Sequence, residues 1–331
     1  MTTSALLGYT GYVGSNLATQ GEYTHLYNSS NINSINGHTF DTITCAAAPG
    51  FKLGATQLNQ TMEGLAYNDA AALDGLKDVL SQVKCRGTFI LISTLSVYAV
   101  TSDAESKKLQ PTVRFSRSQP EHTLNEDRDV WSRSLATGGM SDHEYGRNRA
   151  KLEHWLMTES PFKGNYLIVR LPGIFGPGMK KNYLFDLITN SEWLFKVNLN
   201  TRHQWYPLRH LSEDINTVLA ANKKPHATTI TIVNLFPQDI STGEIVQRFF
   251  PQHLHKCRKN AAFTFVDAVR SKVVALWGRA RREDDEEDST LFRFSRAETM
   301  EQLDGFFGNR RVMVAIREKA VRVKQHLKAN M

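Results

Sequence analysis

The chain has 331 residues, a net charge of +7 and a hydrophobic content of 41%. That length can bury a full core in one large or two closely joined domains, and the composition is that of a soluble globular protein. The basic residues concentrate late, in Arg279–Arg282 and from Arg310 to Lys328. We therefore expect a solvated basic tail and no nucleic-acid-binding face.

The three cysteines, Cys45, Cys85 and Cys257, have no paired spacing. An odd count of this kind excludes a disulfide framework and indicates a reducing compartment. No apolar run has the length of a membrane span, and no charged-then-apolar leader precedes the first expected strand. We expect a cytoplasmic protein with no membrane partner.

A glycine-rich turn follows the first apolar segment, Ala5–Leu7. Gly8 permits a sharp turn, Gly11 lets the backbone approach a diphosphate, and Gly14 lets the following helix pack close to the strand. The helix N-terminus then presents free N–H groups and a partial positive charge to the phosphates. The spacing predicts a dinucleotide-binding turn, although a tight strand-to-helix turn alone also explains three glycines.

Strand-like and helix-like segments alternate through the first half of the chain. We expect further strands near Thr24–Tyr27 and at Thr42–Ala48, Thr88–Thr94 and Asn165–Leu171, with helices at about Ser15–Gln20, at Asn59–Val83 and from near Asp142. This alternation predicts an α/β fold with a doubly wound parallel sheet. Residues 100–142 are polar and too long for a simple connection, so we expect an active-site loop or an insertion there.

The remainder mixes element types. We expect a helix at Lys181–Ile188, a strand at Thr228–Leu235, a helix at Ser241–Phe250, an exposed linker at Arg279–Asp288, a helix from Ser295 to Phe306 with a Ser295–Glu298 capping box, and a basic helical tail. This predicts a nucleotide-binding domain at 1–175, to which 203–236 return. A smaller, mostly helical substrate region at 176–307 and a tail at 308–331 complete the division.

The expected second strand ends in the polar turn Asn28-Ser29-Ser30-Asn31. Dinucleotide-binding folds usually carry an acidic residue here for the ribose hydroxyls, or an arginine for a ribose phosphate. Asn28 and Ser29 could hydrogen-bond the ribose, but such a turn also forms without a ligand. The choice between NAD and NADP therefore stays open.

Three further stretches follow the glycine turn in order: Ile92–Tyr98, Glu144–Arg149 and Arg170–Gly178. Together the four motifs resemble the extended short-chain dehydrogenase/reductase family, the NAD-dependent epimerase/dehydratase group. The resemblance runs from about Ala5 to the strand–helix pair ending at Phe250. It implies a Rossmann sheet, NAD or NADP as cofactor, and a sugar or nucleotide-sugar substrate.

The resemblance also implies catalytic roles. Tyr145 matches the family's catalytic tyrosine, which accepts or returns a substrate proton while hydride moves to or from nicotinamide. Thr94 matches the hydroxyl that hydrogen-bonds the same oxygen. Arg149 stands where the family has a lysine; it keeps the charge but is bulkier and differs in geometry. From the residues alone, Tyr145 could equally be a packed helix tyrosine.

The resemblance also implies which residues contact the cofactor and the substrate. Expected cofactor contacts are Gly8, Thr10, Gly11, Tyr12, Val13, Gly14, Asn28, Ser29, Ala46, Ala47, Tyr145, Arg149 and Pro172, and expected substrate contacts are Ser96, Gly173, Asn182 and His203. Helix capping is an equal alternative for Asn182, and Arg202 or His203 would replace an arginine that grips the nucleotide diphosphate. Leu95 and Ser96 replace the Asp-Glu pair of the family's 4,6-dehydratases, which argues against elimination of water.

His253, His255 and Cys257 alternate as on a strand. A fourth ligand is not evident, so we expect no metal site. The leading hypothesis is an NAD(P)-dependent epimerase or reductase with a small-molecule substrate. The alternative is a cofactor-binding but catalytically weak regulatory or scaffolding protein, and a weaker one is a nucleic-acid-associated protein. A homodimer through the helix that carries Tyr145 stays open.

Overall fold

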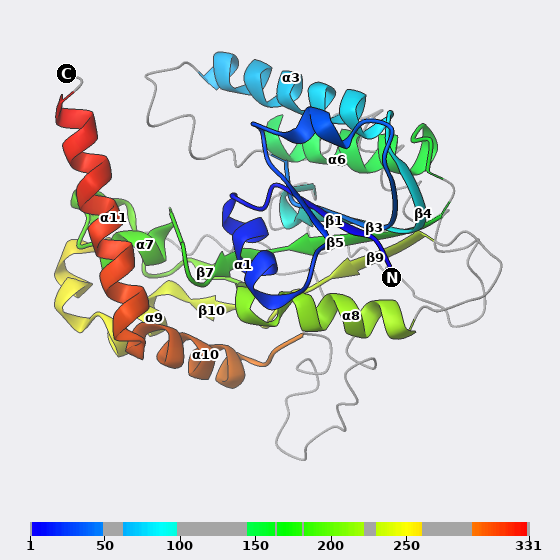
Figure 1. Ribbon diagram of the computed structural model, residues 1–331. Coiled ribbons are helices and arrows are strands. Elements are labelled where there is room, and N and C mark those ends of the chain that lie inside the picture. The colour runs from blue at the N-terminus through cyan, green and yellow to red at the C-terminus, as the bar shows by residue number, and fades with distance from the viewer. Residues whose placement is uncertain are drawn as a thin grey trace.

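The computed structural model describes residues 2–48, 62–97, 144–162, 164–180, 182–221, 230–259 and 293–329. At its centre lies a parallel sheet with the strand order β2-β1-β3-β4-β5-β9 (Figure 1). Its strands are β1 (Ser4–Leu7), β2 (His25–Tyr27), β3 (Thr39–Cys45), β4 (Lys84–Thr94), β5 (Asn165–Leu171) and β9 (Ile230–Asn234). The order reverses at β1, which puts a topological switch point at the carboxyl ends of β1 and β3, the place where open α/β sheets generally bind ligands.

Helices cover both faces of this sheet (Figure 1). On one face lie α3 (Met62–Leu80) and α6 (Glu144–Thr158), and on the other lie α1 (Tyr12–Gln20) and α8 (Leu211–Ala221). Leu7 packs in the core beneath α3 and α6, whereas its neighbour Leu6 packs in the core beneath α1 and α8. Strands buried on both faces explain the continuous apolar runs in the sequence. The predicted doubly wound α/β fold is confirmed.

A third hydrophobic core lies beside the sheet and is built mainly from helices. Its elements are α7 (Tyr183–Ile188), α9 (Thr242–Phe249), α10 (Arg296–Gly308) and α11 (Arg310–Ala329), with the small strand pairs β6 (Gly173–Phe175) with β8 (Trp205–Pro207) and β7 (Arg202–His203) with β10 (Ile240–Ser241). Ser295 and Glu298 form the predicted capping box of α10. Ser241 and Glu244 form a second capping box on α9.

Element boundaries differ from the expected ones in two informative places. The first helix begins at Tyr12, three residues earlier than expected, because Gly11 acts as its N-cap. The alternation of His253, His255 and Cys257 does not correspond to a strand. Pro251 instead begins a 3₁₀ helix, Pro251–Lys256, and the fixed φ of proline favours a first helical turn. The expected loop at 100–142 and the linker at 279–288 lie outside the described residues.

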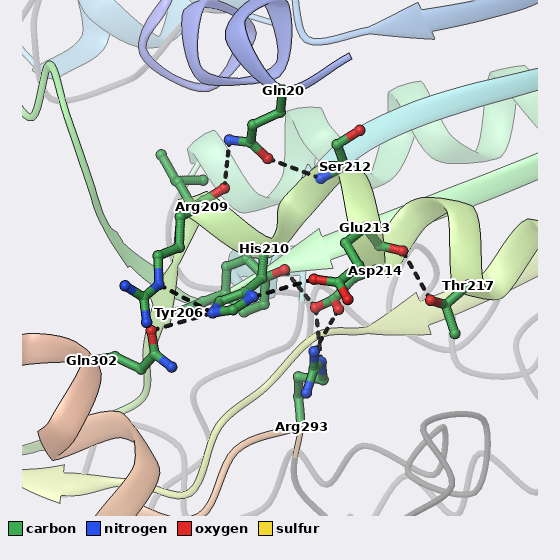
Figure 2. A network of polar contacts seen from close by, with 11 residues as sticks. Gln20, Tyr206, Arg209, His210, Ser212, Glu213, Asp214, Thr217, Arg293 and Gln302 are labelled. Atoms are coloured by element: carbon green, nitrogen blue, oxygen red, sulfur yellow. Dashed lines mark hydrogen bonds and ion pairs between the residues drawn. The ribbon is translucent and has the colours of Figure 1, made fainter.

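A buried polar network anchors the segment that leads into α10 (Figure 2). Arg293 donates two hydrogen bonds to the Asp214 carboxylate of α8, from Nε at 2.8 Å and from Nη2 at 2.7 Å. The Tyr206 hydroxyl donates a third at 2.6 Å. Burial and the Asp214 charge hold the pKa of Tyr206 well above its ordinary value. The network ties the segment before α10 to the start of α8, 79 residues earlier in the sequence.

Candidate nucleotide-binding and catalytic site

The glycine turn brings three backbone segments into close contact. Gly8 has a φ of +82°, and a Cβ there would lie 2.5 Å from the Ala46 carbonyl oxygen. A Cβ on Gly14 would lie 2.1 Å from the Gly8 carbonyl oxygen. Only glycine fits at either position, so the packing of β1, α1 and the end of β3 explains both residues.

The N-terminus of α1 lies at this turn. Gly11 is its N-cap; among the described residues no side chain caps it, and its first turn holds no acidic residue. The first N–H groups of a helix have no partner within the helix, and the helix dipole adds a partial positive charge there. Such an N-terminus at a topological switch point is suited to bind a phosphate group.

Asn28 follows β2 directly and lies beside the glycine turn. Its Oδ1 accepts hydrogen bonds from the Ser30 backbone N–H at 2.9 Å and from the Ser30 hydroxyl at 2.6 Å. Its Nδ2 donates to the Tyr9 hydroxyl at 3.4 Å. Asn28 thus shapes the turn beside the glycine segment, while Ser29 is exposed.

Residues 172–178 lie across the start of α1. The amide of Asn16 donates to the Pro177 carbonyl oxygen at 2.9 Å and to the Tyr12 carbonyl oxygen at 2.8 Å, and the Tyr12 hydroxyl donates to the Gly176 carbonyl oxygen at 3.4 Å. Burial raises the pKa of Tyr12. Sequence reasoning did not find Asn16, although an asparagine on the inner face of a short apolar helix was a usable signal.

Thr94 is the last residue of β4, and Tyr145 lies in the first turn of α6. The 3₁₀ turn Leu95–Val97, which follows Thr94, packs against α6. The Thr94 hydroxyl accepts the Ser96 backbone N–H at 3.2 Å. The structure therefore brings α6, the helix that carries Tyr145, against the turn at the carboxyl end of β4.

Arg149 lies one helical turn after Tyr145 and is only 3% exposed. Its guanidinium carbon is 4.5 Å from the centroid of the Tyr145 ring, in a cation–π arrangement. Burial raises the pKa of the Cys45 thiol, at the end of β3, to about 11, and the charge of Arg149 opposes that rise. The Arg149 guanidinium thus lies over the Tyr145 ring, and its positive charge favours the thiolate of Cys45.

The expected substrate residues make structural contacts of their own. Asn182 caps α7, accepting the Phe185 N–H at 2.9 Å, and donates to the Ile174 carbonyl oxygen at 3.2 Å. A Cβ on Gly173 would lie 2.8 Å from the Gln204 carbonyl oxygen, so the contact between β6 and β8 requires glycine there. Arg202 forms an ion pair with Asp239. His203 packs beside Tyr183 and is half-buried.

Within the described ranges, no three His, Cys, Asp or Glu side chains are grouped to hold a metal ion. His253 is buried, with its Nε2 3.1 Å from the Leu187 carbonyl oxygen. A cavity of about 590 Å³ lies between α1 and α8, and its lining shares no residue with the expected site. Over the same ranges, no helix is both long and apolar enough to cross a membrane.

No protein-family model and no curated protein matches this sequence. Solved structures do match it. A UDP-galactose 4-epimerase is 14% identical over 92% of this chain and 99% of that chain, with a TM-score of 0.53. MoeE5, in complex with UDP-glucose and NAD, is 14% identical over 91% and 99%, with a TM-score of 0.51.

The UDP-N-acetylglucosamine 4-epimerase from Bacillus cereus is 12% identical over 88% of this chain and 94% of that chain, with a TM-score of 0.50. At such identities the likeness concerns the fold, because superfolds host many functions. The chain therefore shares the Rossmann-type fold of these proteins, a parallel sheet with helices on both faces and a smaller helical C-terminal part.

Proposed function

We propose that the chain is an NAD(P)-dependent epimerase or reductase that acts on a sugar or nucleotide-sugar hydroxyl or carbonyl by hydride transfer. The observation that carries this proposal is one shared edge of the sheet. The N-terminus of α1 lies there at the switch point, and α6, which carries Tyr145 and Arg149, packs against the turn that follows β4. The fold shared with nucleotide-sugar enzymes supports the same substrate class.

The glycine turn fits a dinucleotide. We place the diphosphate at the backbone of Thr10, Gly11, Tyr12, Val13 and Gly14, where the helix N-terminus favours an anion. Gly8, Ala46, Ala47 and Pro172 would line the remaining cofactor surface. Asn28 and Ser29 would meet the adenosine ribose. The turn of residues 28–31 carries neither an acidic residue for the ribose hydroxyls nor an arginine for a ribose phosphate, so the proposal covers both NAD and NADP.

Tyr145 is the proposed acid/base that exchanges a proton with the substrate oxygen, and Thr94 would hydrogen-bond that oxygen. A bound nicotinamide would supply the hydride acceptor or donor. Arg149 sets a permanent positive charge against the ring of the phenol that must release its proton. We assign Ser96, Gly173, Asn182 and His203 to the substrate side, where the proposed nucleotide-binding domain at 1–175 and 203–236 meets the proposed substrate region at 176–307.

A second candidate function is a cofactor-binding protein with weak or no turnover. It is favoured by the position of Arg149, whose guanidinium stacks on the Tyr145 ring. In that arrangement Arg149 would stabilise the ring rather than reach a ribose. The two candidates agree on cofactor binding and differ on hydride transfer.

Cofactor binding is tested by releasing and identifying any nucleotide that co-purifies with the protein, then titrating NADH and NADPH by fluorescence. Thermal stabilisation by UDP-glucose and by other nucleotide sugars is measured in parallel. A ligand present at 100 times its Kd should stabilise the folded state by about 2.7 kcal/mol. We expect binding of NADH or NADPH and stabilisation by at least one nucleotide sugar. Failure of both NADH and NADPH to bind would contradict both candidate functions.

A further inference from the structure

A second buried charge network links α6, the helix that carries Tyr145 and Arg149, to β4 and β5. Arg170 contacts the Glu153 carboxylate through Nε, 3.2 Å from each oxygen, and through Nη2, 2.6 Å from Oε2. The Ser93 hydroxyl also donates to this carboxylate. The exposed fractions are 0% for Glu153 and 1% for Arg170. A buried ion pair often contributes no more stability than apolar residues of similar volume, because both charges lose their hydration.

The network joins α6, which carries Tyr145 and Arg149, to β4, which carries Thr94, and to the neighbouring strand β5. Ser93 and Arg170 are register partners on β4 and β5. Thr94 directly follows Ser93 at the end of β4. Glu153 lies on α6, one turn after Arg149 and two turns after Tyr145, so the three residues share one side of the helix.

We infer that Ser93, Glu153 and Arg170 are positioning residues, which fix the rotation and height of α6 so that the Tyr145 phenol faces the Thr94 hydroxyl. The apolar side chains of α6, such as Leu152 and Leu156, pack in the core. Hydrophobic packing stabilises the helix on the sheet but does not by itself fix its orientation. The Glu153 carboxylate accepts from two nitrogens of Arg170 and from the Ser93 hydroxyl. Such charge-assisted hydrogen bonds have defined directions, so they fix the orientation of α6 on the sheet. The catalytic consequence of this network rests on the proposed function. Its effect on the placement of Tyr145 does not.

The chain provides a matched control. Tyr206, Asp214 and Arg293 form the same kind of network, a buried carboxylate held by an arginine and a hydroxyl (Figure 2). That network lies on α8, on the opposite face of the sheet from α6 (Figure 1). Ser93→Ala and Tyr206→Phe each remove one hydroxyl donor from a buried arginine–carboxylate pair. Only the first change touches the helix that carries Tyr145.

The test uses full-length protein labelled with fluorotyrosine. The fluorine resonance of Tyr145 is assigned by its loss in Tyr145→Phe. We expect Ser93→Ala to move this resonance and to slow single-turnover hydride transfer from UDP-glucose to NAD by about 10- to 100-fold, since small misplacements of reacting groups have effects of that size. NADH affinity should stay within about twofold. Tyr206→Phe should change neither the Tyr145 resonance nor the rate of hydride transfer. Ser93→Thr keeps a hydroxyl donor, so both quantities should stay at their wild-type values.

The inference is overturned if Ser93→Ala and Glu153→Gln are folded and both leave the Tyr145 resonance and the rate at wild-type values. If Glu153→Gln does not fold, Ser93→Ala and Ser93→Cys decide the matter. A moved resonance in a protein with no hydride transfer in the wild type would support the positioning network and contradict the proposed function. If the wild type is active but Ser93→Ala changes neither the Tyr145 resonance nor the rate, the result would support the proposed function and contradict the positioning network.

Discussion

The guanidinium of Arg149 lies over the ring of Tyr145, 4.5 Å from its centroid. Tyr145 is the proposed acid/base, and Arg149 is the residue at which this chain departs from the family that its motifs resemble. Because Arg149 is buried, its charge is poorly screened by water and acts strongly on the Tyr145 ring. Substitutions at Arg149 can therefore test how its charge affects the proposed proton transfer by Tyr145.

Replacing Arg149 separates its charge from its shape. Arg149→Lys keeps a positive charge, so hydride transfer should stay within about tenfold of wild type or rise. Arg149→Met removes the charge beside the phenol and should slow transfer by at least about tenfold. Arg147→Met, on the same helix, is the control and should leave the rate unchanged. Loss of NADH binding in Arg149→Lys would show that the arginine is specifically adapted.

The pKa of the Cys45 thiol also depends on the positive charge of Arg149. This pKa is about 11 because the thiol is buried, against an ordinary value of 9.0. A thiol whose pKa is raised on folding contributes stability below about pH 9, and this stability is lost as the pH rises towards 11. Thiol labelling of native protein should therefore spare Cys45 at neutral pH. Arg149→Met should reduce its alkaline labelling further, and faster labelling in that variant would contradict the proximity.

The glycine turn predicts an unequal effect of two alanine substitutions. Gly8→Ala would put a Cβ 2.5 Å from a backbone oxygen at a φ of +82°, so it should destabilise the fold by at least about 2 kcal/mol. Gly75→Ala, in the exposed part of α3 with open space around it, should stabilise by about 0.5–1 kcal/mol. Chemical denaturation measures both. Equal stability of the two variants would contradict the described turn.

The buried pair at α8 should matter far more than an exposed one. Arg293→Met leaves the Asp214 carboxylate buried without its charge partner and should cost about 3–5 kcal/mol. Arg322→Met removes an exposed partner of Glu318 on α11 and should change stability by less than about 0.5 kcal/mol. Thermal and urea unfolding compare them. A loss below about 1 kcal/mol for Arg293→Met would indicate that the segment before α10 is not held through Asp214.

Local signals made much of the fold predictable. The apolar run Asn165–Leu171 is β5 with the same bounds, and the Ser295–Glu298 capping box is formed as predicted, because both depend on neighbours in the sequence. The alternation of His253, His255 and Cys257 did not indicate a strand, because Pro251 begins a 3₁₀ helix that runs to Lys256. No local pattern identifies the partners of Asn16, Glu153 and Asp214, since these partners lie 161, 17 and 79 residues away. The predicted roles of Thr94, Tyr145 and Arg149 stay predictions.

The central claim is that Tyr145 exchanges a proton while hydride moves to a bound nicotinamide. The most direct test mixes the NAD-loaded protein with nucleotide sugars, beginning with UDP-glucose, and follows the absorbance of reduced nicotinamide in the wild type, Tyr145→Phe and the control Tyr23→Phe. We predict reduction in the wild type and in Tyr23→Phe, and a loss of at least about 100-fold in Tyr145→Phe with unchanged NADH affinity. Equal rates in the wild type and Tyr145→Phe would contradict the claim.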